Sequence, residues 1–146
     1  MHELSRLLAP ALIEARRGLD EGGIPIGSVL YRGGEIIGRG HNRRVQELDP
    51  MAHAEIDCLR NAGRQKTYRD TVLVSTLMPC YLCAGAVVQF GIPRVIVGES
   101  QSFPGARSFM ESHRVEVVDL ADPACIALMA AFMRDFPELW NEDIGR

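Results

Sequence analysis

The sequence has no long hydrophobic run, and this absence argues against a membrane-spanning helix. Its apolar stretches are short and are interrupted by Gly, Pro or charged residues, whereas a transmembrane helix needs about 18 consecutive apolar residues. Residues 2–22 carry charges throughout, which is not typical of a signal peptide. We therefore expect a soluble, cytoplasmic protein with no membrane partner.

An excess of positive charge is also missing. The 146 residues contain 16 Lys and Arg against 19 Asp and Glu, so the formal net charge is -3, and the basic residues are scattered. A chain of this kind has no general attraction for polyphosphate, so nucleic acid is not an expected partner. The length predicts one domain, residues 1–146, with one hydrophobic core.

Cysteine is scarce, with four residues, and two of them stand three positions apart. In a reducing cytoplasm such cysteines are more often thiols or metal ligands than disulfides. Cys58 and Cys125 lie in apolar helical patterns, and we interpret them as small buried side chains. Cys80 and Cys83 remain as a Cys-x-x-Cys pair that is available for chemistry.

Hydrophobic periodicity and turn residues predict an alternation of helices and strands. The expected helices cover 4–22, 50–63, 80–91 and 123–133, with room for another within 104–113. The expected strands cover 26–31, 35–40, 71–77, 94–98 and 115–118, and residues 141–146 form an acidic tail. This order predicts an α/β fold, a three-layer α/β/α sandwich around a mixed five-stranded sheet.

One set of residues has the composition of a catalytic zinc site. Cys80 and Cys83 are predicted at the opening of a helix, where positions i and i+3 share a face and the helix dipole favours thiolate. His53 is predicted on the preceding helix, and the strand between them would bring both helix starts to one end of the sheet. Three protein ligands leave a fourth position for water. We therefore expect one Zn²⁺ per chain, bound by His53, Cys80 and Cys83.

Glu55 is predicted to carry protons at this site. It stands two residues after His53, near the open coordination position and not needed as a ligand. Bound Zn²⁺ lowers the pKa of its water to about 7, and a nearby carboxylate can pass that proton to a substrate. The combination of His-x-Glu and Pro-Cys-x-x-Cys is the signature of zinc deaminases. The sequence therefore predicts a hydrolytic deaminase with Glu55 as its catalytic residue.

Other interpretations of the cysteine pair have less support. A redox pair would need a thioredoxin-like context, and a structural zinc would need a fourth Cys or His at short spacing. His2, His41 and His113 lack metal-ligand spacing, and we interpret them as surface residues. A zinc-stabilised binding domain without catalysis stays open as a non-enzyme alternative, although such a domain has no use for Glu55.

Because it carries these motifs, the chain resembles the cytidine deaminase superfamily and, within it, the fungal-type cytosine deaminases. The resemblance covers nearly the whole chain. Besides the zinc motif it rests on the segments GGIPIG (22–27), GRGHN (38–42), YRDT (68–71), GIPR (91–94), GE (98–99) and EDIG (142–145). It implies a cytidine deaminase-like fold, a small-molecule nucleobase as substrate, and a homodimer.

The resemblance also implies a substrate pocket. Asn42 would bind the pyrimidine edge, the backbone N–H of Ala54 would meet the O2 carbonyl, Asp143 would accept from ring N1, and Trp140 would close the pocket. The other expected wall residues are Phe103, Ile26, Leu77 and Met78. An acceptor at N1 disfavours nucleosides, because a ribose there removes the hydrogen and fills the space.

The implied reaction is cytosine plus water giving uracil plus ammonia. Met78 stands where the resembled family has a serine, and Ala54 stands where it has a glycine, so the base itself stays open at this point. Deamination of a purine or pterin base is one alternative, and it would need a wider pocket. Deamination of tRNA adenosine is another, and it would need a basic face that the sequence does not indicate.

Overall fold

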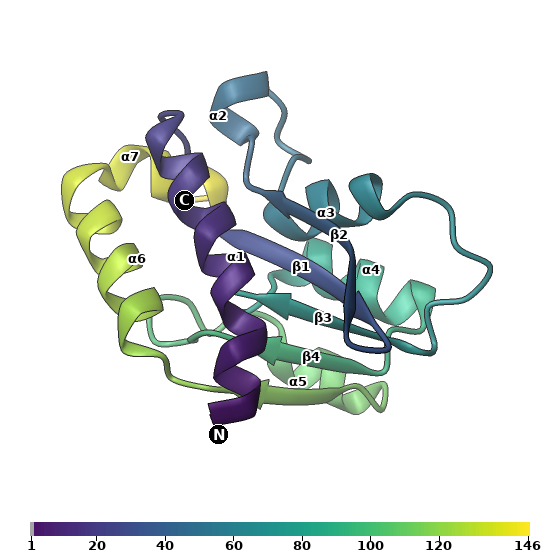
Figure 1. The fold of residues 1–146 in the computed structure, drawn as a ribbon. Helices are drawn as coiled ribbons and strands as arrows, with labels where there is room; N and C mark the ends of the chain where they lie inside the picture. The colour runs from purple at the N-terminus through teal and green to yellow at the C-terminus, as the bar shows by residue number, and fades with distance from the viewer. Residues whose placement is uncertain (1) are drawn as a thin grey trace.

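A computed structural model describes residues 2–146, with side chains from Leu4 onward. A mixed sheet forms the middle of the molecule (Figure 1). Its strands are β1 (Gly27–Arg32), β2 (Glu35–His41), β3 (Thr71–Ser75), β4 (Arg94–Val97) and β5 (Glu116–Asp119). They are arranged in the order β2-β1-β3-β4-β5. Strand β1 is antiparallel to β2 and β3, whereas β3, β4 and β5 are parallel. The predicted mixed five-stranded sheet is confirmed.

Helices cover both faces of this sheet (Figure 1). One face carries α1 (His2–Asp20) and α6 (Pro123–Asp135), and the other carries α3 (Ala54–Ala62), α4 (Tyr81–Phe90) and α5 (Arg107–Ser112). Because successive strand residues point to opposite faces, Leu73 packs with Cys58 on the α3 side, whereas Val74 packs with Leu8 and Cys125 on the α1 side. The three-layer prediction is therefore confirmed, and both cysteines are buried as expected.

Helix α1 lies very close to β1. Gly27 makes this approach possible, because a Cβ at this position would overlap the backbone oxygen of Ala11. The Tyr31 hydroxyl, from the same strand, donates to the carbonyl oxygen of Leu7 at 2.8 Å. Glu14, in the C-terminal half of α1, is thereby held against the end of β2, where it contacts Arg39 and His41.

Two predicted helix starts are placed too early. Asp49 does not cap a helix: its side chain accepts from the Met51 N–H at 2.9 Å and its carbonyl accepts from Ala52, which makes a turn. Helix α3 begins only at Ala54, with His53 as its extended N-cap, and α4 begins at Tyr81, with Cys80 as its N-cap. His53 and Cys80 are thus cap residues rather than helical ones.

Two helices were not predicted at all. The four-residue α2 (Arg44–Glu47) buries no side chain, so it produces no hydrophobic periodicity. The chain end is not a simple acidic tail, because α7 (Pro137–Asp143) begins with a proline in its first turn and buries Trp140. Its one-turn apolar face is too short to be recognised as a helix from periodicity. Among the described helices, none has the length and apolar character needed to cross a bilayer.

The interpretation of His41 as a surface residue is wrong. Its side chain is 1% exposed, and its ring lies between Glu14 and Glu21. Glu14 comes from α1 and Glu21 from the turn that follows it, 27 and 20 residues before His41, so the spacing around His41 gives no sign of them. His113 is exposed as expected, whereas the side chain of His2 lies outside the described residues.

Candidate active site

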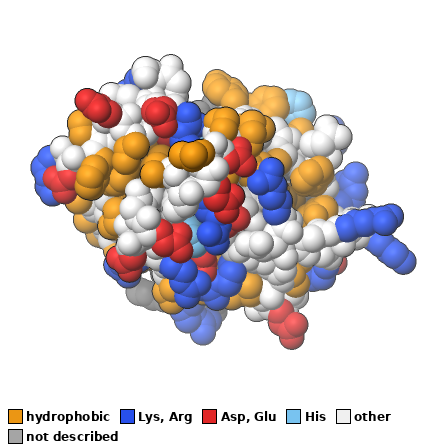
Figure 2. Space-filling view, turned by 90° about the horizontal axis from the view of Figure 1, so that it is seen from above, with side chains coloured by type: hydrophobic (Ala, Val, Ile, Leu, Met, Phe, Trp, Pro, Cys, Tyr) orange, Lys and Arg blue, Asp and Glu red, His pale blue; other side chains and the backbone are white. Residues whose placement is uncertain are grey.

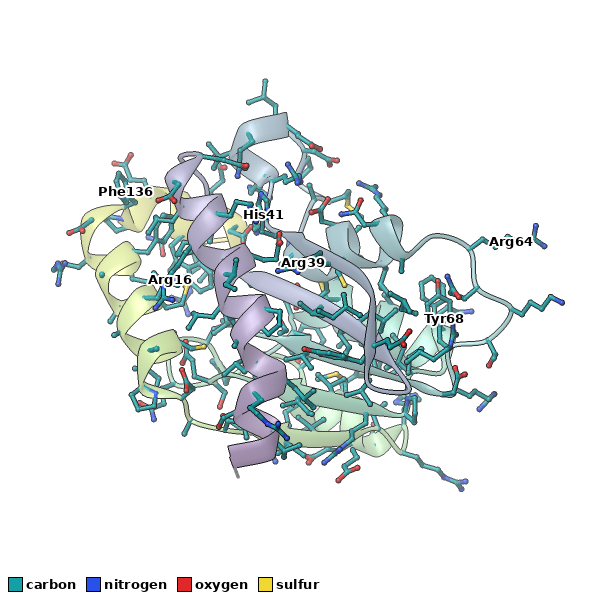
Figure 3. The ribbon with its side chains drawn as sticks, in the orientation of Figure 1. Arg16, Arg39, His41, Arg64, Tyr68 and Phe136 are labelled. Atoms are coloured by element: carbon teal, nitrogen blue, oxygen red, sulfur yellow. The ribbon has the colours of Figure 1, made fainter. Side chains whose placement is uncertain are left out.

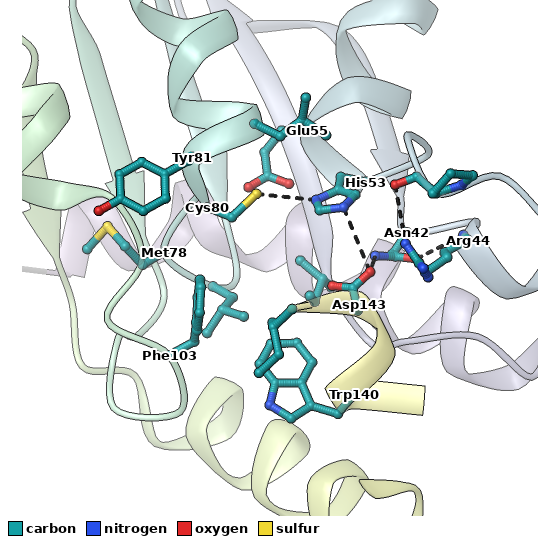
Figure 4. A pocket seen from close by; sticks show the side chains of 15 residues that line it. Asn42, Arg44, His53, Glu55, Met78, Cys80, Tyr81, Phe103, Trp140 and Asp143 are labelled. Carbon is teal, nitrogen blue, oxygen red and sulfur yellow. Dashed lines mark hydrogen bonds and ion pairs between the residues drawn. The ribbon is translucent and has the colours of Figure 1, made fainter. Parts of the chain in front are cut away.

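The predicted zinc ligands lie together. The ligand atoms of His53, Cys80 and Cys83 are all within 4.8 Å of one another, and among the described residues no other group of His, Cys, Asp and Glu does this. The distance from Cys80 Sγ to His53 Nδ1 is 3.4 Å (Figure 4). A tetrahedral ion with bonds of about 2.0–2.3 Å holds its ligand atoms about 3.5 Å apart. One imidazole and two thiolates are also the donors that zinc prefers, so this cluster fits Zn²⁺.

Helix starts position these ligands. His53 and Cys80 are the N-caps of α3 and α4, and Cys83 lies in the first turn of α4. Two helix N-termini therefore direct their partial positive charge at one point, which favours thiolate. Hydrogen bonds from Cys83 and His53 lower the pKa of Cys80 to about 4, although burial opposes this. The hydrogen bond with Cys80, followed by burial, raises the pKa of Cys83. Cys80 is therefore the more readily ionised of the two thiols.

His53 is held in a strongly charged environment. Burial lowers its pKa, but the hydrogen bond to Cys80 and the charges of Glu55 and Asp143 outweigh burial and raise it to about 9. Its Nδ1 faces the Cys80 sulfur, whereas its Nε2 lies 3.8 Å from Asp143 Oδ1. One nitrogen of the His53 ring thus faces the metal cluster, and the other faces the carboxylate of Asp143.

Glu55 lies beside the cluster and is 4% exposed. Burial, followed by the charge of Cys80, raises its pKa to about 7, while the charge of His53 opposes the shift. A carboxyl group with a pKa near neutrality can both take and release a proton in one reaction cycle. The environment of Glu55 therefore suits general acid-base chemistry.

A cavity of about 320 Å³ opens in front of these groups. It is lined by all of the predicted site residues except Ala54 and Cys83, whose side chains are fully buried. The predicted lining residues are Ile26, Asn42, His53, Glu55, Leu77, Met78, Cys80, Phe103, Trp140 and Asp143. They come from both ends of the chain, and Figure 4 shows α7 lying across the opening with Trp140 and Asp143 directed inward.

Two aromatic rings form one wall of the cavity. Trp140 is 5% exposed, and its ring meets Phe103 edge-to-face with centroids 5.9 Å apart. Phe103 comes from the loop between β4 and α5, whereas Trp140 comes from α7. The face of an aromatic ring is an apolar surface of the kind that planar ligands pack against.

The opposite end of the cavity is polar. The backbone N–H of Arg44 donates to Asn42 Oδ1 at 2.9 Å, so the amide nitrogen of Asn42 is directed to Asp143 Oδ1 at 3.4 Å. The Asp143 side chain is 4% exposed. Burial raises its pKa, against the charge of His53 and the hydrogen bond from Asn42. This end therefore presents one donor and one carboxylate acceptor next to each other.

Met78 lines the cavity but packs mostly elsewhere. Its side chain is 2% exposed and belongs to the core cluster that contains Ala106 and Met110. Gly105 gives it room, because a Cβ there would come within 2.6 Å of the Met78 side chain. Figure 4 shows the Met78 side chain directed away from Glu55 and Asp143. A methionine is thus accommodated here without filling the polar end of the cavity.

Several lining residues were missed by the sequence interpretation: Arg44, Pro50, Tyr81, Leu82 and Ile144. Arg44 bonds Glu142 at 3.1 Å and so ties α2 to α7 across the opening. Tyr81 stands at the rim and is 74% exposed. Both are neighbours of recognised motifs, since Arg44 follows Asn42 by two and Tyr81 lies inside Cys-x-x-Cys, and that proximity is the signal that was available.

Several known proteins are similar in sequence to this chain over most of its length. Residues 1–99 match the family described as the cytidine and deoxycytidylate deaminase zinc-binding region. A cytosine deaminase from Candida albicans is 44% identical over 141 residues, which cover 94% of each chain. A tRNA-specific adenosine deaminase from Streptococcus pyogenes is 38% identical over 146 residues, which cover 92% of each chain.

Solved structures agree with the fold. One from a study of tRNA A34 deaminases has a TM-score of 0.68 and 32% identity, and covers 80% of this chain and 98% of its own. A guanine deaminase from Nitrosomonas europaea has a TM-score of 0.71 at 21% identity, over 86% of this chain and 81% of its own, which supports the fold alone. The chain belongs to the cytidine and deoxycytidylate deaminase zinc-binding family, and it is a zinc-dependent deaminase, a hydrolase that acts on a C–N bond.

Proposed function

We propose that this deaminase acts on a free pyrimidine base, converting cytosine and water to uracil and ammonia. The observation that carries the proposal is the place of Asp143. Its buried carboxylate lies at the polar end of the cavity, beside the Asn42 amide nitrogen and 3.8 Å from the zinc ligand His53. A free base has an N1–H to donate to such an acceptor, and the similarity to the Candida albicans cytosine deaminase supports the same substrate.

The residues of the cavity each have a role in this reaction. Hydrolytic deamination forms a C–O bond at C4 of cytosine and breaks the C–N bond to the amino group. His53, Cys80 and Cys83 would hold a zinc ion, which would act as a Lewis acid and lower the pKa of a water at the site to about 7. Glu55 accepts one proton from the water and delivers it to ring N3, and then moves the second proton to the departing amino group, which leaves as ammonia.

Other residues bind and orient the base. Asn42 donates from Nδ2 to the O2 carbonyl, and Asp143 accepts from N1–H. Phe103 and Trp140 pack on the ring and exclude water from it. A site with a fixed donor and acceptor rejects bases that leave these groups unpaired. We further assign the Ala54 backbone N–H, at the start of α3, to the O2 carbonyl.

Replacing Asp143 tests the substrate assignment. We expect Asp143→Asn to raise the KM for cytosine by about 10-fold to 100-fold, because the variant presents an amide where N1–H needs a strong acceptor. Ammonia release would be measured with cytosine, cytidine, adenine and guanine, on wild type and on the variant. Asp135→Asn, at an exposed carboxylate on α6, is the matched control and should behave as wild type. A wild-type preference for cytidine over cytosine would contradict the role given to Asp143.

Deamination of tRNA adenosine is the second candidate, because relatives with that name are 38% identical to this chain. A protein that grips tRNA needs a basic face to bind phosphates. Figure 2 shows acidic side chains interspersed among the basic ones on the face that it displays, and the net charge of the whole chain is -3. We therefore favour the free base over tRNA. An anticodon stem-loop with adenosine at the wobble position, added to the same panel, separates the two candidates.

We propose that the protein works in a reducing compartment such as the cytoplasm, where Cys80 and Cys83 keep their thiols. We also propose a homodimer that uses the outer face of α4. This helix contains no charged residue. Its inner face buries Cys83, Ala84 and Val87, yet Tyr81 and Phe90 remain 74% and 45% exposed. Gln89 is the one exposed amide among these largely apolar side chains. A helix with apolar side chains on both sides buries both of them, and a two-fold contact with a second copy would bury the outer side.

Gly85 offers a clean test of this dimer. It lies on α4, and apart from its chain neighbours and the nearby backbone of that helix, a Cβ at this position would meet no atom within 4 Å. We expect Gly85→Arg to leave the fold intact and to convert a dimer to a monomer, because a bulky charge would then stand in the interface. Sedimentation velocity measures the change, and Ala9→Arg on the exposed face of α1 is the control. A wild-type monomer at micromolar concentration would contradict the proposal.

A further inference from the structure

His41 is a buried histidine with two acidic partners. Its Nδ1 lies 2.9 Å from Glu14 Oε1 and its Nε2 lies 2.9 Å from Glu21 Oε1. The ring is 1% exposed and lies next to α1, as Figure 3 shows together with Arg39. Neither ring nitrogen faces the metal cluster, so His41 is separate from the zinc site. Its chain neighbour, however, is Asn42.

Both hydrogen-bond partners of the ring are carboxylates. An ionised carboxylate only accepts hydrogen bonds, and both partners are held ionised. Burial raises the pKa of Glu14, but hydrogen bonds from His41 and Arg39 outweigh it and lower that pKa, while the hydrogen bond from His41 lowers the pKa of Glu21. Each ring nitrogen of His41 therefore has an ionised carboxylate as its hydrogen-bond partner. His41 thus stands clamped between two carboxylates.

A chain of hydrogen bonds leads from this clamp to the cavity. Glu21 Oε1 accepts from His41 Nε2 and also from Gln46 Nε2, at 3.1 Å. Gln46 Nε2 also donates to the backbone carbonyl of Asn42 at 3.2 Å. The clamp thus reaches the main chain of the residue whose amide lies in the cavity.

The same turn is held from the other side by α3. Asp57 Oδ2 accepts from the His41 N–H at 3.0 Å and from Arg43 Nε at 3.0 Å. Asn42 itself donates its N–H to the Ile26 carbonyl and accepts from the Arg44 N–H on Oδ1. The backbone N–H and the side-chain oxygen of Asn42 are therefore both engaged, and its Nδ2 is left as the group that faces Asp143.

We propose that His41 is a positioning residue for Asn42, acting through Glu21 and Gln46 to hold the Asn42 turn so that its amide nitrogen meets the base. The proposal rests on the proposed function, since it takes Asn42 as a substrate-binding residue. Charge-assisted hydrogen bonds are stronger and better oriented than neutral ones. The hydrogen bond between His41 and the ionised Glu21 is of this kind, so it holds Glu21 firmly.

Two substitutions of His41 separate positioning from simple packing. The amide nitrogen of a glutamine stands near Nε2 of histidine, and that of an asparagine stands near Nδ1. We expect His41→Gln to keep the bond to Glu21 and a KM for cytosine near that of wild type. We expect His41→Asn, which keeps only the Glu14 side, to raise this KM on the order of tenfold, the equivalent of one hydrogen bond. Zinc content per chain should stay unchanged in both.

Gln46→Leu tests the same path without altering the buried ring. It removes the link between Glu21 and the Asn42 carbonyl, and it should also raise the KM for cytosine on the order of tenfold. Arg17→Ala is the matched control: Arg17 bonds Glu14 Oε2 at 2.9 Å, is 57% exposed and does not contact His41. This control should leave the KM unchanged.

The outcomes distinguish this proposal from the function on which it rests. If His41→Asn and Gln46→Leu lower the melting temperature but leave the KM at the wild-type value, His41 is a structural residue and the proposal is wrong. Asn42→Ala serves as the reference. If it raises the KM and the other two variants do not, only the positioning role fails. If Asn42→Ala itself leaves the KM unchanged, the substrate role of Asn42 fails first, and the positioning role falls with it.

Discussion

Glu55→Gln is expected to abolish ammonia release and to leave zinc bound. Glutamine has nearly the same shape as glutamate but cannot take a proton at neutral pH, and it is not one of the three zinc ligands. Loss of a positioned general acid-base costs about 10²-fold to 10⁴-fold in rate. The kcat for cytosine should fall by at least that factor, since the same carboxyl group moves two protons in each turnover. Steady-state ammonia release, together with zinc content by atomic absorption, measures both effects.

The control for this substitution is Glu47→Gln. Glu47 lies on the short helix α2, its side chain is 52% exposed, and it does not line the cavity. Its kcat should match that of wild type. Should Glu55→Gln retain wild-type turnover with full zinc occupancy, another residue would have to carry the protons and the mechanism would be wrong.

Cys83→Ala is expected to lose both zinc and activity. The substitution removes one of three protein ligands, and two ligands hold zinc far less tightly. Because a ligand that binds only the folded state stabilises it, losing an ion present at 1,000 times its Kd lowers the free energy of unfolding by about 4 kcal/mol. Thermal unfolding with and without added zinc should therefore show stabilisation by the metal in wild type and none in the variant.

Cys58→Ala is the matched control for the zinc ligand. Cys58 is also a fully buried cysteine, on α3, but it packs in the apolar cluster with Leu30 and Leu73. Its removal leaves a small cavity that costs about 1 kcal/mol, and zinc content should stay at one ion per chain. Full zinc binding by Cys83→Ala would show that Cys83 is not a ligand.

Local sequence patterns were sufficient for most of the fold and for the metal ligands. The continuous runs of β-branched and apolar residues in 71–75 and 94–97 indicate strands that are buried on both faces, and a Gly-Gly turn indicates the hairpin. Such signals depend only on residues that are near one another in the chain. They failed where short turns decided the conformation: Asp49 closed a turn instead of capping α3, and α2 and α7 are too short to show a period.

The sequence by itself determined the zinc chemistry of this protein, because the His53 and Cys80 motifs are short and each motif carries its own local geometry. Only the tertiary structure decided what surrounds that chemistry. Asn42 and Asp143 are 101 residues apart in the chain and meet at 3.4 Å, and His41 is buried by carboxylates from another element. Their meeting depends on how α1 and α7 pack on the body of the fold, and no periodicity along the chain reports such long-range packing.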